Sequence, residues 1–216
     1  MVIEFEKAVR SLAEWINSRH EQSILRITGG GGSGKSVFLQ ALRNLVVGQV
    51  AVLSTDPYLV SSFLRRAVKD EHGDRLTACH PEATFLPALE RDILMLRSGR
   101  DILLVPDTHQ EPEPLQAEKN VIVEGIGAIF VPAACFDLSI FIYCDEDVEI
   151  ARRMPRDSAE RGVDAAKIVA DFKIRRDQFY KHVWPRRSEC ELVLKSRQDF
   201  SFECLSDSKN IIAAKV

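Results

Sequence analysis

The residues of this chain best suited to chemistry form one run, Gly29-Gly30-Gly31-Gly32-Ser33-Gly34-Lys35-Ser36. The run meets the Walker A pattern G-x-x-x-x-G-K-[ST] in full. Glycines let such a loop turn its backbone N–H groups inward, and the N-terminus of a following helix adds the positive end of its dipole. Lys35 would reach the β- and γ-phosphates of a nucleotide, while the Ser36 hydroxyl would ligate Mg²⁺. A merely flexible glycine turn is the alternative.

The flanking segments supply the two elements that a phosphate loop requires. Residues 23–28 are typical of a short strand that runs directly into the glycines, and residues 37–47 have helical spacing. Because strand, motif and helix coincide, the run predicts binding of a polyphosphate. Further strands are predicted at 50–54, 102–105, 121–123, 138–143 and 191–194, with helices at 3–15 and 86–96. This alternation indicates an α/β fold with a mainly parallel sheet flanked by helices.

Two acids stand where predicted strands end. Asp56 follows strand 50–54, and Glu124 follows Val121-Ile122-Val123. Ligands of open α/β sheets gather at the carboxyl ends of the strands. Glu124 there would hold Mg²⁺ or its water, unless it is an exposed loop carboxylate. Asp56 would face an acceptor hydroxyl, or would instead cap a helix that begins at Pro57.

The phosphate loop predicts nucleotide binding but not the reaction. The chain has no N-K-x-D motif for guanine and no L-S-G-G-Q stretch. These absences argue against GTPases and transporter ATPases.

A family resemblance adds to these motifs. The stretches G-G-G-G-S-G-K-S, S-T-D-P-Y, H-P-E-A, V-E-G-I and R-R-M-P-R-D-S-A-E-R-G occur in this order between about residues 24 and 194. In this respect the chain resembles the uridine kinase and phosphoribulokinase family, whose lid has the form R-R-x-x-R-D-x-x-E-R-G. The resemblance implies a P-loop NTPase fold of the nucleoside and nucleotide kinase type, with a short lid at about 152–163.

The resemblance also implies roles for particular residues. Asp56 would act as general base on the acceptor hydroxyl, and ATP would be the phosphoryl donor. Arg153, Arg156 and Arg161 match the lid arginines, whose guanidinium groups suit phosphate oxygens, and Pro155 and Gly162 are predicted to break the lid helix. We expect Arg152 to be an ordinary surface residue.

The acceptor side departs from the family pattern. In His80-Pro81-Glu82, which resembles D-H-P-D-A, Cys79 replaces the first acid, so that Glu82 would bind a sugar or form part of a polar turn. Uridine kinases grip the pyrimidine with a loop of the form Y-D-x-x-x-H-x-R. In this chain the loop is shortened and lacks the tyrosine and the arginine, so that His109 is the candidate contact with the acceptor. The acceptor therefore stays open between a nucleoside, such as uridine or cytidine, and a sugar, sugar phosphate or related alcohol.

Composition restricts the partners. The 216 residues carry a net charge of −3 with acids and bases mixed, which argues against a nucleic-acid surface or a polybasic membrane anchor. Five cysteines without a C-x-x-C pair, no signal-peptide pattern and no long apolar run predict a cytoplasmic protein. We expect one domain over residues 1–216, whose tail at 196–216 shows no clear periodicity. A homo-oligomer stays open.

Two functions follow from this pattern. The first is an ATP-dependent kinase that phosphorylates an alcohol of a small molecule. The alternative is a regulatory module of the same fold that binds the nucleotide without phosphorylating an acceptor.

Overall fold

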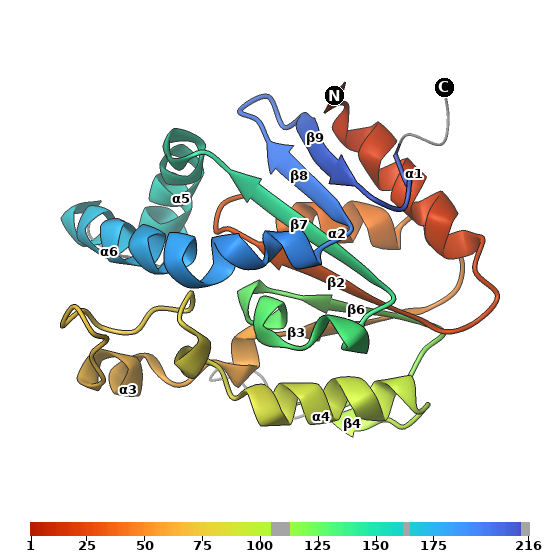
Figure 1. Cartoon of the computed structure of the whole chain (residues 1–216), viewed down its shortest axis with the longest axis horizontal. Helices are drawn as coiled ribbons and strands as arrows, with labels where there is room; N and C mark the ends of the chain where they lie inside the picture. Colours follow the sequence, from red (N-terminus) through yellow and green to blue (C-terminus); the bar gives the residue numbers. More distant parts are fainter. Residues whose placement is uncertain (105–112, 162–164, 213–216) are drawn as a thin grey trace.

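A seven-stranded sheet forms the centre of the molecule (Figure 1). The structure is a computed structural model that describes residues 1–104, 113–161 and 165–212, without the side chains of 156–161, 165–168 and 170. The sheet has the order β1-β9-β8-β7-β2-β6-β3. Its strands are β1 (Val2–Ile3), β2 (Ser23–Gly29), β3 (Val50–Ser54), β6 (Asn120–Glu124), β7 (Leu138–Cys144), β8 (Leu192–Ser196) and β9 (Phe202–Asp207). The pair β4 (Ile102–Leu103) and β5 (Pro114–Leu115) forms a separate hairpin.

Six α-helices surround the sheet in the described part of the chain. They are α1 (Phe5–Asn17), α2 (Lys35–Arg43), α3 (Ser62–Ala67), α4 (Leu86–Arg97), α5 (Glu146–Arg161) and α6 (Ala165–Gln178). Short 3₁₀ segments are η1 (Asp56–Tyr58), η2 (Pro81–Ala83), η3 (Ile126–Phe130), η4 (Ala133–Cys135) and η6 (Trp184–Glu189), and η5 (Phe179–Val183) is a π-helical turn. The predicted α/β architecture with a mainly parallel sheet is confirmed.

The register brings three strand ends to one edge of the sheet. Strands β3, β6, β2, β7 and β8 run parallel, and β2 lies between β6 and β7. Glu124 pairs with Ile27 on one side and with Ser54 on the other. The arrowheads of β6 and β7 point to the end of the molecule at which α3, α5 and α6 lie (Figure 1). Residues that follow β2, β3 and β6 must therefore meet at this edge.

The core has layers on both faces of the sheet. Leu25 and Ile27 of β2 pack with α1 and α2, whereas Ile24 packs on the opposite face with α4. A further cluster on that second face joins η3 and η5 to Phe141 of β7. The central strand is buried on both faces along its whole length, as expected of a parallel strand covered on both sides. This packing gives the phosphate loop a rigid support.

Arg26 is a fully buried cation in that central strand. Its guanidinium donates to Ser139 Oγ (3.1 Å), to the Ala128 carbonyl (3.3 Å) and to the Val131 carbonyl (3.2 Å). It also lies 4.9 Å from the centre of the Phe136 ring. Arg26 thus fixes η3, the segment that directly follows Glu124-Gly125.

The structure corrects the prediction that Pro155 breaks the lid helix. Helix α5 runs from Glu146 to Arg161 with Pro155 inside it. Proline removes the single N–H that would bond to the Ala151 carbonyl, and the helix continues through this gap. Gly162, the second predicted break, lies outside the described residues.

The tail, for which the sequence predicts no element, contains a strand of the central sheet. Strand β9 pairs antiparallel with β8 and β1, and Ile211 and Ile212 are buried in the core. The alternation of β9 is hidden in the sequence because the pairing with β8 shifts at Val193/Leu194, which leaves Leu205 without a partner in the register. Such a bulge interrupts the period-2 pattern on which strand prediction depends.

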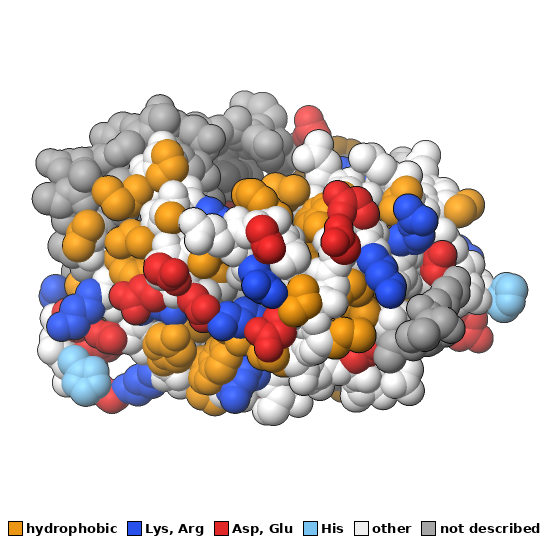
Figure 2. Space-filling view, turned by 90° about the horizontal axis from the view of Figure 1, so that it is seen from above, with side chains coloured by type: hydrophobic (Ala, Val, Ile, Leu, Met, Phe, Trp, Pro, Cys, Tyr) orange, Lys and Arg blue, Asp and Glu red, His pale blue; other side chains and the backbone are white. Residues whose placement is uncertain are grey.

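The surface mixes charges. Figure 2 shows acidic and basic side chains interspersed over one face of the molecule. Within the described residues, no helix combines the length and apolarity needed to cross a bilayer.

Candidate active site

The phosphate loop connects β2 to α2 at the edge where the strands end. At Gly29, φ is 126° and an added Cβ would lie 2.0 Å from the Ile142 carbonyl oxygen, so only glycine fits there. Gly34 begins α2 from a left-handed conformation with φ of 88°. Gly30 N–H donates to the Ile142 carbonyl (3.1 Å), which ties the loop to β7. The sequence-predicted loop from Gly29 to Ser36 is therefore built as a strand–loop–helix unit.

Side chains of the loop are held by the loop itself. The buried Ser33 hydroxyl donates to the Gly30 carbonyl (2.8 Å). Lys35 Nζ donates to the carbonyls of Gly29 (3.3 Å) and Gly30 (2.5 Å). Lys35 thus curls back over the loop, to the place where a phosphate would offer a better acceptor.

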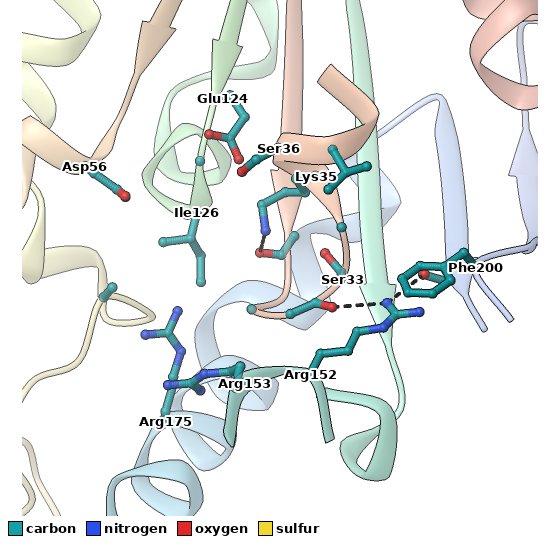
Figure 3. A pocket seen from close by; sticks show the side chains of 18 of the residues that line it. Ser33, Lys35, Ser36, Asp56, Glu124, Ile126, Arg152, Arg153, Arg175 and Phe200 are labelled. Carbon is teal, nitrogen blue, oxygen red and sulfur yellow. Dashed lines mark hydrogen bonds between the residues drawn. The ribbon is translucent and has the colours of Figure 1, made fainter. Parts of the chain in front are cut away.

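A cavity of about 530 Å³ opens over the loop. Lys35, Ser36, Glu124 and Asp56 line it together, although they come from three separate strand ends. Figure 3 shows Glu124 and Ser36 on the β6 side of Lys35, with Asp56 facing the cavity from the β3 side. The structure therefore brings these four predicted site residues into one cavity, together with most of the phosphate loop.

The donor set around Ser36 fits a magnesium ion. A hydroxyl and a carboxylate are hard oxygen ligands, and Mg²⁺ in phosphoryl-transfer sites takes few protein ligands because phosphates and waters complete its shell. The described residues include no cluster of three or more His, Cys, Asp or Glu side chains able to hold a metal. The hydroxyl of Ser36 and the carboxylate of Glu124 suit a cation that arrives with a nucleotide, because they supply two hard oxygen ligands.

Asp56 is placed by a buried anchor two residues further on. The Tyr58 hydroxyl donates to Asp92 Oδ2 of α4 (2.6 Å), and both residues are buried. Thr55, not Asp56, stands at the N-cap position of η1, and Asp56 is the first residue of that helix. The alternative that Asp56 caps this helix is therefore wrong, and its carboxylate, which has no hydrogen-bond partner among the described residues, faces the cavity.

Burial and charge oppose each other at the loop. Burial lowers the pKa of Lys35, while the nearby carboxylates of Glu124 and Asp56 act in the opposite direction. Burial likewise raises the pKa of Glu124, and Lys35 partly offsets this rise. Each group is thus short of compensating charge, a state that an incoming magnesium nucleotide would relieve.

Glu149 of α5 organises two arginines beneath the loop. This buried carboxylate accepts from Arg176 Nη1 (2.8 Å) and from Arg153 Nη1 (3.2 Å). A Cβ at Gly31 would lie 2.8 Å from Glu149 Oε1, which shows how closely the loop rests on this pair. Arg153 lines the cavity, as expected of a lid arginine. The side chains of Arg156 and Arg161, also on α5, lie outside the described part.

The surface role expected of Arg152 is wrong. Arg152 donates to the Gly32 carbonyl of the loop (3.1 Å), to Ser196 Oγ (3.0 Å) and to the Arg197 carbonyl (2.6 Å). Its guanidinium lies 4.5 Å from the centre of the Phe200 ring (Figure 3). Arg152 therefore links the phosphate loop to the hairpin between β8 and β9.

Several residues that line the cavity were not predicted from the sequence, among them two aromatic residues and two arginines. Phe200 and Phe202 come from the tail, Arg175 from α6 and Arg65 from α3. Only the short alternation Phe202-Glu203-Cys204 gave any signal for the tail, and the two arginines stand in charged helical stretches without a motif. Their positions follow from tertiary structure.

The predicted acceptor residues lie apart from this lining. His80 Nδ1 accepts from Glu82 N (3.3 Å) in the turn η2, and the His80 ring packs 4.6 Å from that of His182. Neither His80 nor Glu82 is among the described residues that line the cavity. His80 stands at the N-cap of the turn η2 and Glu82 lies within it, and their role in acceptor binding stays a prediction. His109 lies outside the described residues.

The fold and this site define a protein of the P-loop NTPase fold. The family model described as "Phosphoribulokinase / Uridine kinase family" matches residues 24–201, and the chain belongs to this family. It is 26% identical over 180 residues to a phosphoribulokinase of Synechocystis, and 28% identical over 182 residues to a uridine kinase of Chlamydia pneumoniae. These matches cover 80% and 79% of this chain, but 53% of the first relative and 80% of the second.

A solved structure supports the fold. D-glycerate 3-kinase from Cryptococcus neoformans superimposes with a TM-score of 0.65 at 12% identity, over 93% of this chain and 97% of that one. At this identity the likeness concerns the fold alone.

Proposed function

We propose that this chain is an ATP-dependent kinase that transfers the γ-phosphoryl group of ATP to an alcohol of a small molecule. One observation carries the proposal. Lys35, Ser36 and Glu124, which suit a magnesium nucleotide, share a cavity with Asp56, a carboxylate that has no hydrogen-bond partner among the described residues. Membership of a kinase family supports the same conclusion.

Each residue has a task in the proposed reaction. Backbone N–H groups of the loop and the Lys35 ammonium bind the phosphates, and Mg²⁺ supplies charge neutralisation when Ser36 and Glu124 hold it directly or through water. Asp56 accepts the proton of the attacking hydroxyl. Arg153 and Arg175 stabilise negative charge on the transferring group from the α5 and α6 side.

An exposed aromatic ring in the cavity suits the nucleotide base. Phe200 lines the cavity together with Arg152 and is exposed, whereas Phe202 is buried in the core. Aromatic rings stack on the flat face of any nucleobase and do not read its hydrogen-bonding groups. The aromatic side chain therefore favours binding of a base without selecting which base. ATP is proposed from the family.

The first test is ADP release from Mg-ATP with and without candidate alcohols. We expect release to depend on one class of acceptor and to disappear when EDTA removes the metal. Lys35→Ala should abolish transfer, because both the phosphate-binding charge and the loop contact are lost. A Lys35→Ala protein that works at the wild-type rate would refute the assignment.

The substitution Asp56→Asn tests the proposed role of Asp56 as the general base. Loss of a general base should lower kcat by about 10² to 10⁴, while binding of Mg-ATP stays at the wild-type level. An unchanged kcat would exclude Asp56 as the base. Binding of ATP without release of ADP in response to any acceptor would instead favour the regulatory alternative.

A further inference from the structure

Two arginines line the cavity wall without a carboxylate partner among the described residues. Arg65 of α3 and Arg175 of α6 both line the cavity, on the side of Leu59 and Ala78. Among the described residues neither forms an ion pair, whereas Arg75, Arg97, Arg153 and Arg176 each do. An unpaired guanidinium in a partly buried site is unfavourable unless a ligand supplies the counter-charge.

Arg65 is held in position while most of its donors stay available. Its Nε donates to the Val60 carbonyl (2.8 Å), and its own carbonyl accepts from Leu76 N (2.9 Å). The two Nη groups have no partner among the described residues. The backbone and Nε are thus fixed, and the outer edge of the guanidinium is free to bind an anion in bidentate fashion.

The charges around Arg65 are mainly of the same sign. Burial lowers its pKa, and Arg75, Arg175 and Arg66 act in the same direction, whereas Asp56 is the carboxylate that opposes them. Asp56 is also the proposed base for the acceptor hydroxyl. Arg65 therefore lies within electrostatic reach of the place where the acceptor must bind.

Arg175 marks the boundary between the donor and acceptor sides. A Cβ at Gly31 of the phosphate loop would lie 3.5 Å from Arg175 Nη2. The charge of Arg175 also acts on both Lys35 and Arg65. Figure 3 shows its guanidinium reaching into the cavity from below Ile126, opposite Lys35. Arg175 is thus suited to the transferred phosphoryl group, which leaves Arg65 for the acceptor.

We propose that the acceptor is an anionic alcohol, a hydroxy acid or a phosphorylated sugar, whose carboxylate or phosphate binds to the Nη groups of Arg65. This inference rests on the proposed kinase function and specifies its acceptor. A neutral nucleoside would leave the Arg65 charge uncompensated in the closed site. Neutral sugars should bind weakly for the same reason, because they carry no anionic group.

Matched pairs of acceptors test the proposal. ADP release from Mg-ATP is measured with glycerol against glycerate, ribose against ribose 5-phosphate, ribulose against ribulose 5-phosphate, and with uridine and cytidine. We expect the anionic member of one pair to exceed its neutral partner in kcat/KM by at least about 100-fold. Preference for uridine, cytidine or a neutral sugar would overturn this inference and leave the kinase function intact. Failure of every acceptor would count against the kinase function itself.

Variants of Arg65 then locate the anion. Arg65→Gln should raise KM for the anionic acceptor by about 10- to 100-fold, with KM for ATP unchanged, and Arg65→Lys should recover part of the loss. Arg66→Gln, an exposed neighbour on the same helix, is the matched control and should behave as wild type. An equal loss for ATP and acceptor, or an effect equally large for Arg66, would refute the role of Arg65.

A measurement on the wild-type protein guards against misfolded variants. Inorganic phosphate or sulfate should inhibit competitively against the acceptor at saturating ATP, because either anion can occupy the Arg65 site. Inhibition that competes only with ATP would contradict the proposal.

Discussion

Glu124 illustrates how a single site residue trades stability against function. Its carboxylate is partly buried beside Lys35, and burial raises its pKa above the usual value. In the folded state ionisation is therefore less favourable than in the unfolded chain. A free-energy cost of this kind is expected where a residue is retained for binding a cation.

Glu124→Gln should raise the thermal stability of the nucleotide-free protein at neutral pH. The folded-state pKa is raised, so the cost is full above that pKa and vanishes as pH falls below 4.5, the value for the unfolded chain, where the carboxyl becomes protonated in both states. The gain in Tm should therefore shrink as the pH falls through this range. Each kcal/mol of unfolding free energy corresponds to about 2–4 °C in Tm. Calorimetry between pH 4 and 8 measures it.

The control is Glu6→Gln on the exposed surface of α1. It should show no such pH-dependent gain. If Glu124→Gln is less stable than wild type at pH 7, then Glu124 contributes to the fold and not only to the site.

At the scale of elements, Arg26 connects the central strand to the segment that follows Glu124. Arg26→Met should destabilise the fold by about 3 kcal/mol or more, because two buried carbonyls and a hydroxyl lose their donor. The corresponding decrease in Tm is about 6–12 °C. Arg43→Met, at the last turn of α2, is the comparison and should change Tm little. A loss for Arg26→Met no larger than that for Arg43→Met would show that the buried guanidinium is dispensable.

The hairpin between β8 and β9 supplies Phe200, which adopts a left-handed conformation with φ of 65° and remains 61% exposed. An exposed aromatic ring next to Arg152 and the phosphate loop has room for a base to stack on it. Phe200→Ala should raise KM for ATP by about 10-fold with little change in KM for the acceptor. Leu205→Ala on the same hairpin, also exposed, should leave both constants unchanged. Equal effects of the two substitutions would exclude a specific role for the ring.

Across the whole molecule, the parts that could be predicted are those with local requirements. The loop needs glycine where Gly29 meets the Ile142 carbonyl, and Lys35 and Ser36 begin the following helix, so that a short pattern contains the phosphate site. Strand ends place Asp56 and Glu124 because parallel strands finish at one edge. These features depend on a few neighbouring residues.

The rest depends on tertiary contacts. Arg65, Arg175 and Phe200 reach the cavity from segments far apart in sequence, and nothing in their local pattern distinguishes them from surface residues. The sequence likewise does not show that Arg152 bonds to both the loop and the hairpin. Contacts of this kind, between segments far apart in the sequence, form only when the sheet is assembled.

The Arg152 link between the loop and the hairpin has a consequence for proteolysis. Arg197 offers a tryptic site on the hairpin, and its carbonyl is held by Arg152. If a nucleotide tightens the loop, linkage requires that it also tighten the hairpin, because coupling between two sites is reciprocal. Mg-ATP should therefore slow cleavage after Arg197 in the wild type but not in Arg152→Ala, so that a protease can report occupancy of the active site from the opposite end of the chain.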